Sequence, residues 1–128
     1  MLHHPLYTSG IHTSAETTAD DNLVPLFKQY GVDMVLSGHN HHYERSLKDG
    51  IYYIVTGGGG APLNNFPNIN LNPYSQVRQK IYEFVTLDIN CATGQLEYQV
   101  WDLDGELIDG PLFFSRTVPQ QFLPMIYH

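Results

Sequence analysis

The sequence predicts an α/β fold that consists mostly of strands, with one or two helices. A mostly apolar run, Val32–Leu36, directly follows a segment with helical periodicity, and a helix that leads into a strand without polar alternation is typical of an αβ unit. Nine Tyr and six Phe among 128 residues favour strands. Beyond residue 42, short runs rich in strand-forming residues alternate with turn sequences, which indicates hairpins.

The first expected element is a helix that ends at Gly31. Thr17 or Thr18 can cap its first turn, which also contains acidic residues suited to the positive end of the helix dipole. Pro25 opposes this assignment, because an interior proline removes one helical hydrogen bond. The pattern places four apolar residues at helical spacing on one face: Leu23, Leu26, Phe27 and Tyr30.

The strands are expected in the rest of the chain. Asp49-Gly50 indicates a tight hairpin turn, and Cys91–Gly94 a second turn. Residues 61–77, with three Pro and five Asn, are expected to form a mobile loop. Residues 111–128 are expected to form an extended C-terminal tail that packs through Phe113, Phe114, Phe122 and Ile126. The expected strands are Val32–Leu36, Tyr43–Leu47, Ile51–Thr56, Lys80–Ile89, Gln95–Asp102 and a short one after Gly105.

Composition limits the classes of partner. The net charge of −7, with only six scattered basic residues, argues against nucleic acid, because phosphate-backbone binding needs clustered Lys and Arg. No apolar run approaches the ~20 residues that span a bilayer, and no signal peptide is recognisable, so neither a membrane partner nor a compartment is predicted. One cysteine excludes an intrachain disulfide. We expect residues 1–128 to be a single-domain fragment whose first strand lies upstream.

The chemistry-bearing residues are concentrated near the beginning. Neutral imidazole is the commonest metal-binding side chain in proteins, and histidines gathered at the end of a buried strand suit a metal site. Six of the seven histidines lie within the first 42 residues: His3, His4, His12, His39, His41 and His42.

The spacing of His39 and His41 predicts two metal ions. Residues two apart in an extended segment point in opposite directions, so these imidazoles address adjacent ions more readily than they chelate one. Such a pair of ions suits a two-metal site that clamps the attacking and leaving oxygens of an in-line displacement. His3 would supply a third ligand from another loop. Three neutral imidazoles do not offset the charge of two ions, and the nearby carboxylates of Glu44 and Asp49 are poorly placed to do so.

Three segments resemble the C-terminal half of calcineurin-like metallophosphoesterases, in particular the purple acid phosphatases. The resemblance covers about residues 1–90, so the expected fold is half of an α/β/β/α sandwich. The segments are His3-His4-Pro5-Leu6-Tyr7, Gly38-His39-Asn40-His41-His42-Tyr43-Glu44-Arg45 and Val55-Thr56-Gly57-Gly58-Gly59-Gly60.

The resemblance implies a role for each matching residue. His3 and His39 would bind one metal, His41 the other, and His12 would contact the phosphate and protonate the leaving group. Direct roles for His4 and His42 are left open. The four glycines would allow close backbone packing under the site, or less simply cradle the phosphate. Tyr43, Glu44 and Arg45 would brace the histidine loop through hydrogen bonds.

The upstream motifs of the family, Asp-x-His, Gly-Asp-x-x-Asp and Gly-Asn-His, do not occur in this chain. The whole protein would bind two ions (Fe, Zn or Mn), and this fragment none or one, so the fragment is expected to be inactive alone. Its partners would be a phosphate ester, the missing N-terminal half and, through an exposed strand edge, a second copy. The family is often exported or periplasmic. The alternative is a non-catalytic histidine-rich module that binds a metal or an anion.

Overall fold

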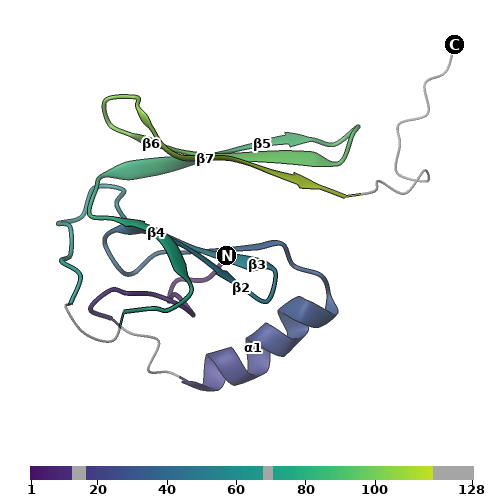
Figure 1. Ribbon diagram of the computed structural model, residues 1–128, viewed down its shortest axis with the longest axis horizontal. Helices are drawn as coiled ribbons and strands as arrows, with labels where there is room; N and C mark the ends of the chain where they lie inside the picture. The colour runs from purple at the N-terminus through teal and green to yellow at the C-terminus, as the bar shows by residue number, and fades with distance from the viewer. Residues whose placement is uncertain (13–16, 68–70, 117–128) are drawn as a thin grey trace, which may run out of the picture. The chain divides into compact units, whose positions relative to one another are not determined.

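The computed structural model describes residues 1–12, 17–67 and 71–116, and these form one helix and two β-sheets (Figure 1). The chain divides into two compact units, Met1–Phe84 and Val85–His128, called here the N-terminal and C-terminal units. No described helix is long and apolar enough to cross a membrane. The elements are α1 (Thr17–Gln29), β1 (Met34–Ser37), β2 (Tyr43–Lys48), β3 (Ile51–Thr56), β4 (Ser75–Gln79), β5 (Glu83–Asn90), β6 (Gln95–Asp102) and β7 (Leu107–Ser115).

The helix forms where the sequence predicts it, with Pro25 inside it, and its end is well defined. Gly31 has φ +62°, its N–H donates to the Lys28 carbonyl, and the N–H of Val32 donates to the Phe27 carbonyl. This pair of bonds is a Schellman motif, in which glycine supplies the left-handed residue. The predicted apolar face is partly wrong: Val24 and Phe27 pack on the core, whereas Leu26 and Tyr30 are exposed.

The N-terminal sheet has the strand order β1-β3-β2-β4, so β3 lies inside it. β3 pairs in parallel with β1 and antiparallel with β2, and β2 pairs antiparallel with β4. Asp49 (φ +53°) and Gly50 (φ +80°) form the β2–β3 turn, which confirms the predicted hairpin. This topology places the loop after β1 next to the C-terminal end of β3.

The core of the N-terminal unit lies between this sheet, the helix and the first residues of the chain. The buried cluster consists of Leu6, Val35, Ile51 and Tyr53, against which Val24 and Phe27 pack. The N–H of Leu2 donates to the Leu36 carbonyl, and the N–H of Gly38 to the His3 carbonyl. The segment around His3 is therefore hydrogen-bonded to β1 and to the loop that follows it.

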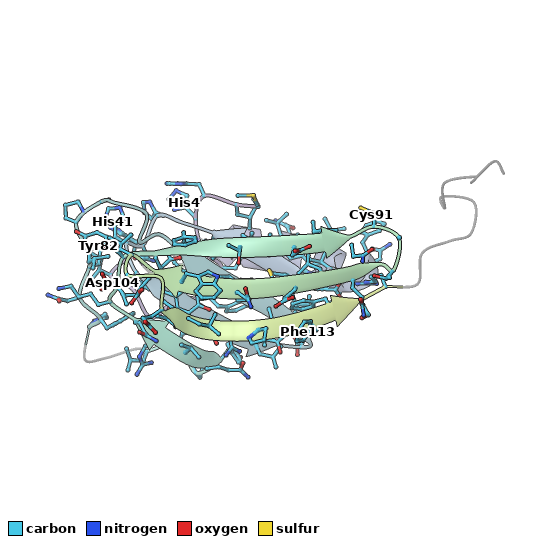
Figure 2. All side chains as sticks on the ribbon, turned by 90° about the horizontal axis from the view of Figure 1, so that it is seen from above. His4, His41, Tyr82, Cys91, Asp104 and Phe113 are labelled. Carbon is cyan, nitrogen blue, oxygen red and sulfur yellow. The ribbon has the colours of Figure 1, made fainter. Side chains whose placement is uncertain are left out.

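The C-terminal unit contains the sheet β5-β6-β7, with β6 and β7 antiparallel. Tyr98 and Val100 of β6 are fully buried. Cys91 is exposed in the turn between β5 and β6, and Phe113 is an exposed side chain of β7 (Figure 2). The expected packing of Phe113 is therefore wrong, and Phe122 and Ile126 lie outside the described residues.

Two expected segment boundaries need correction. β4 begins within the predicted loop 61–77, and residues 111–115 of the predicted tail belong to β7. The short strand expected after Gly105 is therefore the first part of β7, whereas β4 and residues 111–115 were missed. Prolines precede or interrupt these segments, and the hydrogen bonds that form them depend on partner strands elsewhere in the chain. The mobility of the remaining loop and the single-domain organisation stay predictions.

Candidate metal and phosphate site

The loop Gly38–His42 joins β1 to β2 and is compact enough to present its histidines in different directions. His39 has φ +66°, a left-handed conformation that is uncommon for a residue with a side chain but in which His is enriched. The N–H of Asn40 donates to the Gly38 carbonyl, and the N–H of His42 donates to the Asn40 carbonyl. Two successive tight turns therefore separate the ring of His39 from that of His41.

Four imidazoles gather on the outer side of this loop. His39 Nδ1 lies 3.2 Å from His3 Nε2. The ring of His39 lies with its centroid 4.1 Å from that of His4 and 4.5 Å from that of His12. Burial lowers the pKa of His39, and the neighbouring imidazoles, His4 first, lower it further. The structure thus brings together three of the predicted site residues, His3, His12 and His39, and adds His4.

His41 points elsewhere, as the spacing argument requires. Its Nδ1 lies 2.9 Å from the carbonyl oxygen of Pro62. A carbonyl only accepts hydrogen bonds, so Nδ1 carries a proton, and in the neutral ring Nε2 is the nitrogen with the lone pair. Metal-binding histidines usually have one ring N–H fixed in this way. The backbone of His41 is also paired with Asn64, whose N–H and side-chain oxygen both bond to it.

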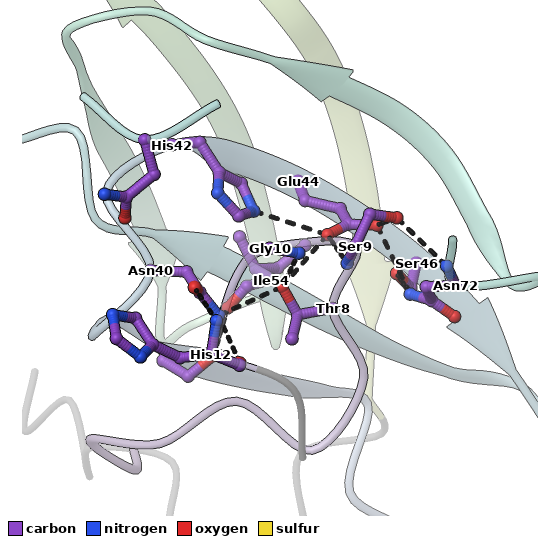
Figure 3. Close-up of polar contacts among 12 residues, drawn as sticks. Thr8, Ser9, Gly10, His12, Asn40, His42, Glu44, Ser46, Ile54 and Asn72 are labelled. Carbon is purple, nitrogen blue, oxygen red and sulfur yellow. Dashed lines mark hydrogen bonds and ion pairs between the residues drawn. The ribbon is translucent and has the colours of Figure 1, made fainter. Parts of the chain in front are cut away.

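Asn40 holds His12 in place from within the protein (Figure 3). It is fully buried, its Oδ1 accepts from the N–H of His12 at 3.1 Å, and its Nδ2 donates to the carbonyl of His12 at 2.8 Å. Nδ2 also lies 3.2 Å from Thr8 Oγ1. One carboxamide therefore fixes the backbone on both sides of His12, although the His12 ring is exposed.

Glu44 lies at the centre of a buried polar network beneath the loops (Figure 3). Its carboxylate accepts from the N–H of Ser9 at 2.6 Å, from Ser9 Oγ at 2.7 Å, from Thr8 Oγ1 at 3.2 Å and from Asn72 Nδ2 at 3.4 Å. Burial alone would raise the pKa of Glu44, but hydrogen bonds from His42 and Ser9 hold it below its ordinary value. Glu44 therefore stays ionised and ties residues 8–9 and 72 to β2.

His42 is buried in this interior and does not reach the imidazole cluster. Its Nε2 lies 3.4 Å from Glu44 Oε2, and its ring centroid lies 4.6 Å from that of Phe66.

A second buried carboxylate, that of Glu83, accepts from Thr56 Oγ1 at 2.9 Å and from the N–H of Gly58 at 3.1 Å. Burial raises the pKa of Glu83, and these bonds oppose that rise.

Tyr43 and Arg45, also expected to brace the histidine loop, have their described contacts with other strands of the sheet. Tyr43 is fully buried in β2, between Thr56 of β3 and Gln79 of β4 in the register. The Arg45 guanidinium donates to the Gln76 side chain and lies 5.8 Å from the centroid of the Tyr52 ring. These contacts of Arg45 lie within the sheet and away from residues 8–12.

Close backbone packing under the site depends on glycine at two of the four expected positions. A Cβ on Gly57 would lie 2.0 Å from the Asn40 carbonyl oxygen, and a Cβ on Gly58 would lie 2.4 Å from the Ile81 carbonyl oxygen. A Cβ on Gly59 would meet nothing within 4 Å. Outside this run, a Cβ on Gly10 would overlap the Asn40 side chain. Gly57 and Gly10 therefore enclose Asn40.

Sequence reasoning missed Asn40, Ser9 and Asn72. Asn40 lies between two histidines, and a neutral carboxamide at that position does not by itself indicate a functional role. Asn72 lies in a Pro- and Asn-rich loop, where nothing in the sequence indicates that it is buried. A polar residue such as Ser9 carries no sign of burial in the sequence, because burial depends on the partner that the fold supplies.

No family model matches the chain. Human acid phosphatase type 7 is 30% identical over 156 aligned residues, which cover 91% of this chain and 35% of the human protein. An Arabidopsis thaliana protein named probable inactive purple acid phosphatase 1 is 32% identical over 91 residues, covering 57% of this chain and 15% of that protein.

A solved structure agrees with these relatives. The purple acid phosphatase PPD1 from yellow lupin seeds superposes with a TM-score of 0.72 at 26% identity, over 88% of this chain and 24% of that one. This chain is purple acid phosphatase-like. Its strands in two sheets and one short helix match a fragment of the purple acid phosphatase fold, and it spans about a third of the human relative's length and less of the others.

Proposed function

We propose that this chain supplies the histidine side of a two-metal site that hydrolyses phosphate esters. The observation that carries the proposal is the convergence of His3, His12 and His39, which come from separate positions in the chain onto one surface. Similarity to phosphatases in sequence and in fold supports the same reading.

The residues present fit part of such a site. Imidazole nitrogens suit Zn and Fe ions, and the 3.2 Å between His3 Nε2 and His39 Nδ1 suits two ligands of one ion. Nδ1 of His41 is bonded to a carbonyl, which leaves Nε2 for a second ion. The carboxylates near this loop, Glu44 and Glu83, are buried and bonded within the protein. The acidic ligands of a two-metal site would therefore come from a partner segment, the N-terminal half of the catalytic domain.

The bound ions would supply positive charge that offsets the charge developing on the phosphate. His12 would donate a proton to the leaving-group oxygen as the phosphorus–oxygen bond breaks and water adds to phosphorus. Asn40 would keep His12 in the required position, since it bonds to both sides of the His12 backbone.

The first test is the coding sequence upstream of Met1, where we expect in-frame Asp-x-His and Gly-Asn-His elements. The second is hydrolysis by the extended protein and by this chain alone. The extended protein should hydrolyse para-nitrophenyl phosphate, lose that activity on chelation and regain it with added metal. If this chain alone hydrolyses the ester at the rate of the extended protein, the proposed division of the site is wrong.

The role of His12 can be separated from mere binding. In the extended protein, His12→Ala should lower kcat by about 100-fold or more for an alkyl phosphate, whose leaving group needs a proton. The loss should be much smaller for para-nitrophenyl phosphate, because nitrophenolate leaves without protonation. Equal losses for the two esters would contradict proton donation by His12.

The second candidate function is that of a non-catalytic metal-binding module, which the grouping of His3, His4 and His39 favours. His3, His4 and His39 could together hold one ion, which is what a non-catalytic metal-binding module needs. An upstream sequence without acidic metal-binding elements, and an extended protein that binds metal but hydrolyses neither ester, would favour that module. Sedimentation of the chain alone would test the further proposal that an exposed strand edge pairs with a second copy.

A further inference from the structure

His4 has no role in the proposed two-metal site, yet its ring lies against two of the residues assigned to it. One ligand atom each from His3, His4 and His39 lies within 4.8 Å of the others. Among the described residues, no other group of three His, Cys, Asp or Glu side chains meets this condition.

The distances suit a single tetrahedral ion. Two nitrogens bound to Zn²⁺ at about 2.0–2.1 Å lie about 3.3 Å from each other, and His3 Nε2 lies 3.2 Å from His39 Nδ1. The ring of His4 is tilted by 45° to that of His39, with the centroids 4.1 Å apart. The ligand atom of His4 lies within 4.8 Å of those of His3 and His39, and the His4 side chain is exposed.

The backbone holds these residues together before any ion binds. The N–H of Gly38 donates to the carbonyl of His3 at 3.1 Å, and Leu2 donates to Leu36 at 2.9 Å. These bonds place His3 and His4 beside His39, and the left-handed φ of His39 directs its ring toward them. Because His3 and His4 are exposed, an ion can reach them without any opening of the protein.

A hydrogen bond between two imidazoles would also explain the 3.2 Å contact, with one ring as donor and the other as acceptor. That arrangement needs only His3 and His39. It leaves the approach of His4 to the same ring without a cause, so the contribution of His4 distinguishes the two explanations.

We propose that His3, His4 and His39 bind one divalent transition-metal ion in this chain by itself, with His4 as the third ligand. Three protein ligands leave one tetrahedral position for a group from outside the chain. The site shares His3 and His39 with the proposed function, but it depends neither on hydrolysis nor on the upstream half.

The test is calorimetric titration of Zn²⁺ into the metal-free chain, with Co²⁺ absorption as an independent report of coordination. We expect one ion per chain. Loss of groups that merely support a ligand costs 10–100-fold in affinity, so His4→Ala should weaken binding by about 100-fold. His4→Asp retains a ligand oxygen and should recover most of the affinity.

Two controls complete the experiment. Asp104→Ala removes an exposed carboxylate of the C-terminal unit and should leave Zn²⁺ affinity unchanged. Thermal unfolding of the metal-free His4 variants should match that of the parent, because His4 is exposed.

Either of two results overturns the inference: no Zn²⁺ binding by the chain, or unchanged affinity and stoichiometry in His4→Ala. Its failure is distinguishable from failure of the proposed function. An extended protein that hydrolyses esters while His4→Ala binds Zn²⁺ normally removes only the role of His4. If this chain binds Zn²⁺ as expected but the extended protein has no hydrolytic activity, only the proposed hydrolytic function is wrong.

Discussion

The exposed imidazole cluster and the buried polar network beneath it lie within a few residues of each other in sequence but use their side chains in opposite ways. His3, His4 and His12 are exposed and touch mainly other imidazoles. Glu44 and Asn40 are fully buried and have several hydrogen bonds each. Substitutions in the network should therefore cost stability, and substitutions in the cluster should cost ligand binding alone.

The largest expected effect is that of Glu44→Gln. The amide keeps the volume, but it loses the charge that Ser9, Thr8 and Asn72 bond to and turns one acceptor into a donor. We expect a loss of about 3 kcal/mol in the free energy of unfolding, measured with urea near pH 7. Glu106→Gln, at an exposed position, should change it by less than about 0.5 kcal/mol.

The loss of stability in Glu44→Gln should depend on pH. The folded-state pKa of Glu44 lies below its ordinary value of 4.5, so its contribution is present above about pH 4.5 and is lost as the pH falls through the lowered value. The stability difference between parent and Glu44→Gln should therefore shrink in acid. A difference that stays constant down to about pH 2 would contradict this assignment.

Gly57→Ala should come next. The added Cβ would lie 2.0 Å from the Asn40 carbonyl oxygen, and neither backbone can yield without moving the histidine loop. We expect a loss of about 2 to 3 kcal/mol in the free energy of unfolding. The matched control is Gly59→Ala, whose Cβ meets nothing within 4 Å. Equal effects of the two substitutions would show that close packing at Gly57 is unimportant.

Asn40→Ala removes the hydrogen bonds that join the buried polar network to His12 of the imidazole cluster. The substitution removes both hydrogen bonds to the His12 backbone and should cost about 1 to 2 kcal/mol, since His12 is near the surface and water can replace part of them. The amide signal of His12 in a ¹H–¹⁵N spectrum should shift and broaden. Asn65→Ala, which removes an exposed side chain bonded to Lys80, should leave that signal in place.

The smallest expected effect has the opposite sign. His39→Gly relieves the left-handed conformation at φ +66°, and this gain exceeds the entropic cost of glycine, so stability should rise by about 0.5 kcal/mol while metal affinity is lost. His4→Gly, at a position outside that region of φ, should lower stability slightly. A destabilised His39→Gly would mean that the imidazole cluster supports the fold, which would remove the contrast between the two regions.

The helix, the hairpin at Asp49-Gly50 and the grouping of histidines could be predicted because each depends on local pattern. The face that the helix buries could not. Leu26 and Tyr30 share a helical stripe with Phe27, but Val24 is the residue that packs with Phe27 on the core, so the position of the sheet decides between two overlapping faces. β4 was missed for a related reason, because its partner β2 is about 30 residues away in the chain.

The sequence by itself determined which residues are candidates for metal chemistry, since imidazoles after a buried strand, two residues apart, predict metal ligands that point in different directions. Tertiary structure alone decided which imidazoles meet and what holds them. His4 joins His39 because Leu2 and His3 are hydrogen-bonded to β1 and the loop after it, and Glu44 turned inward because residues 8–9 and 72 supply the donors that a buried carboxylate needs. Spacing along the chain encodes local direction, whereas burial and contact depend on distant segments that only the folded protein brings together.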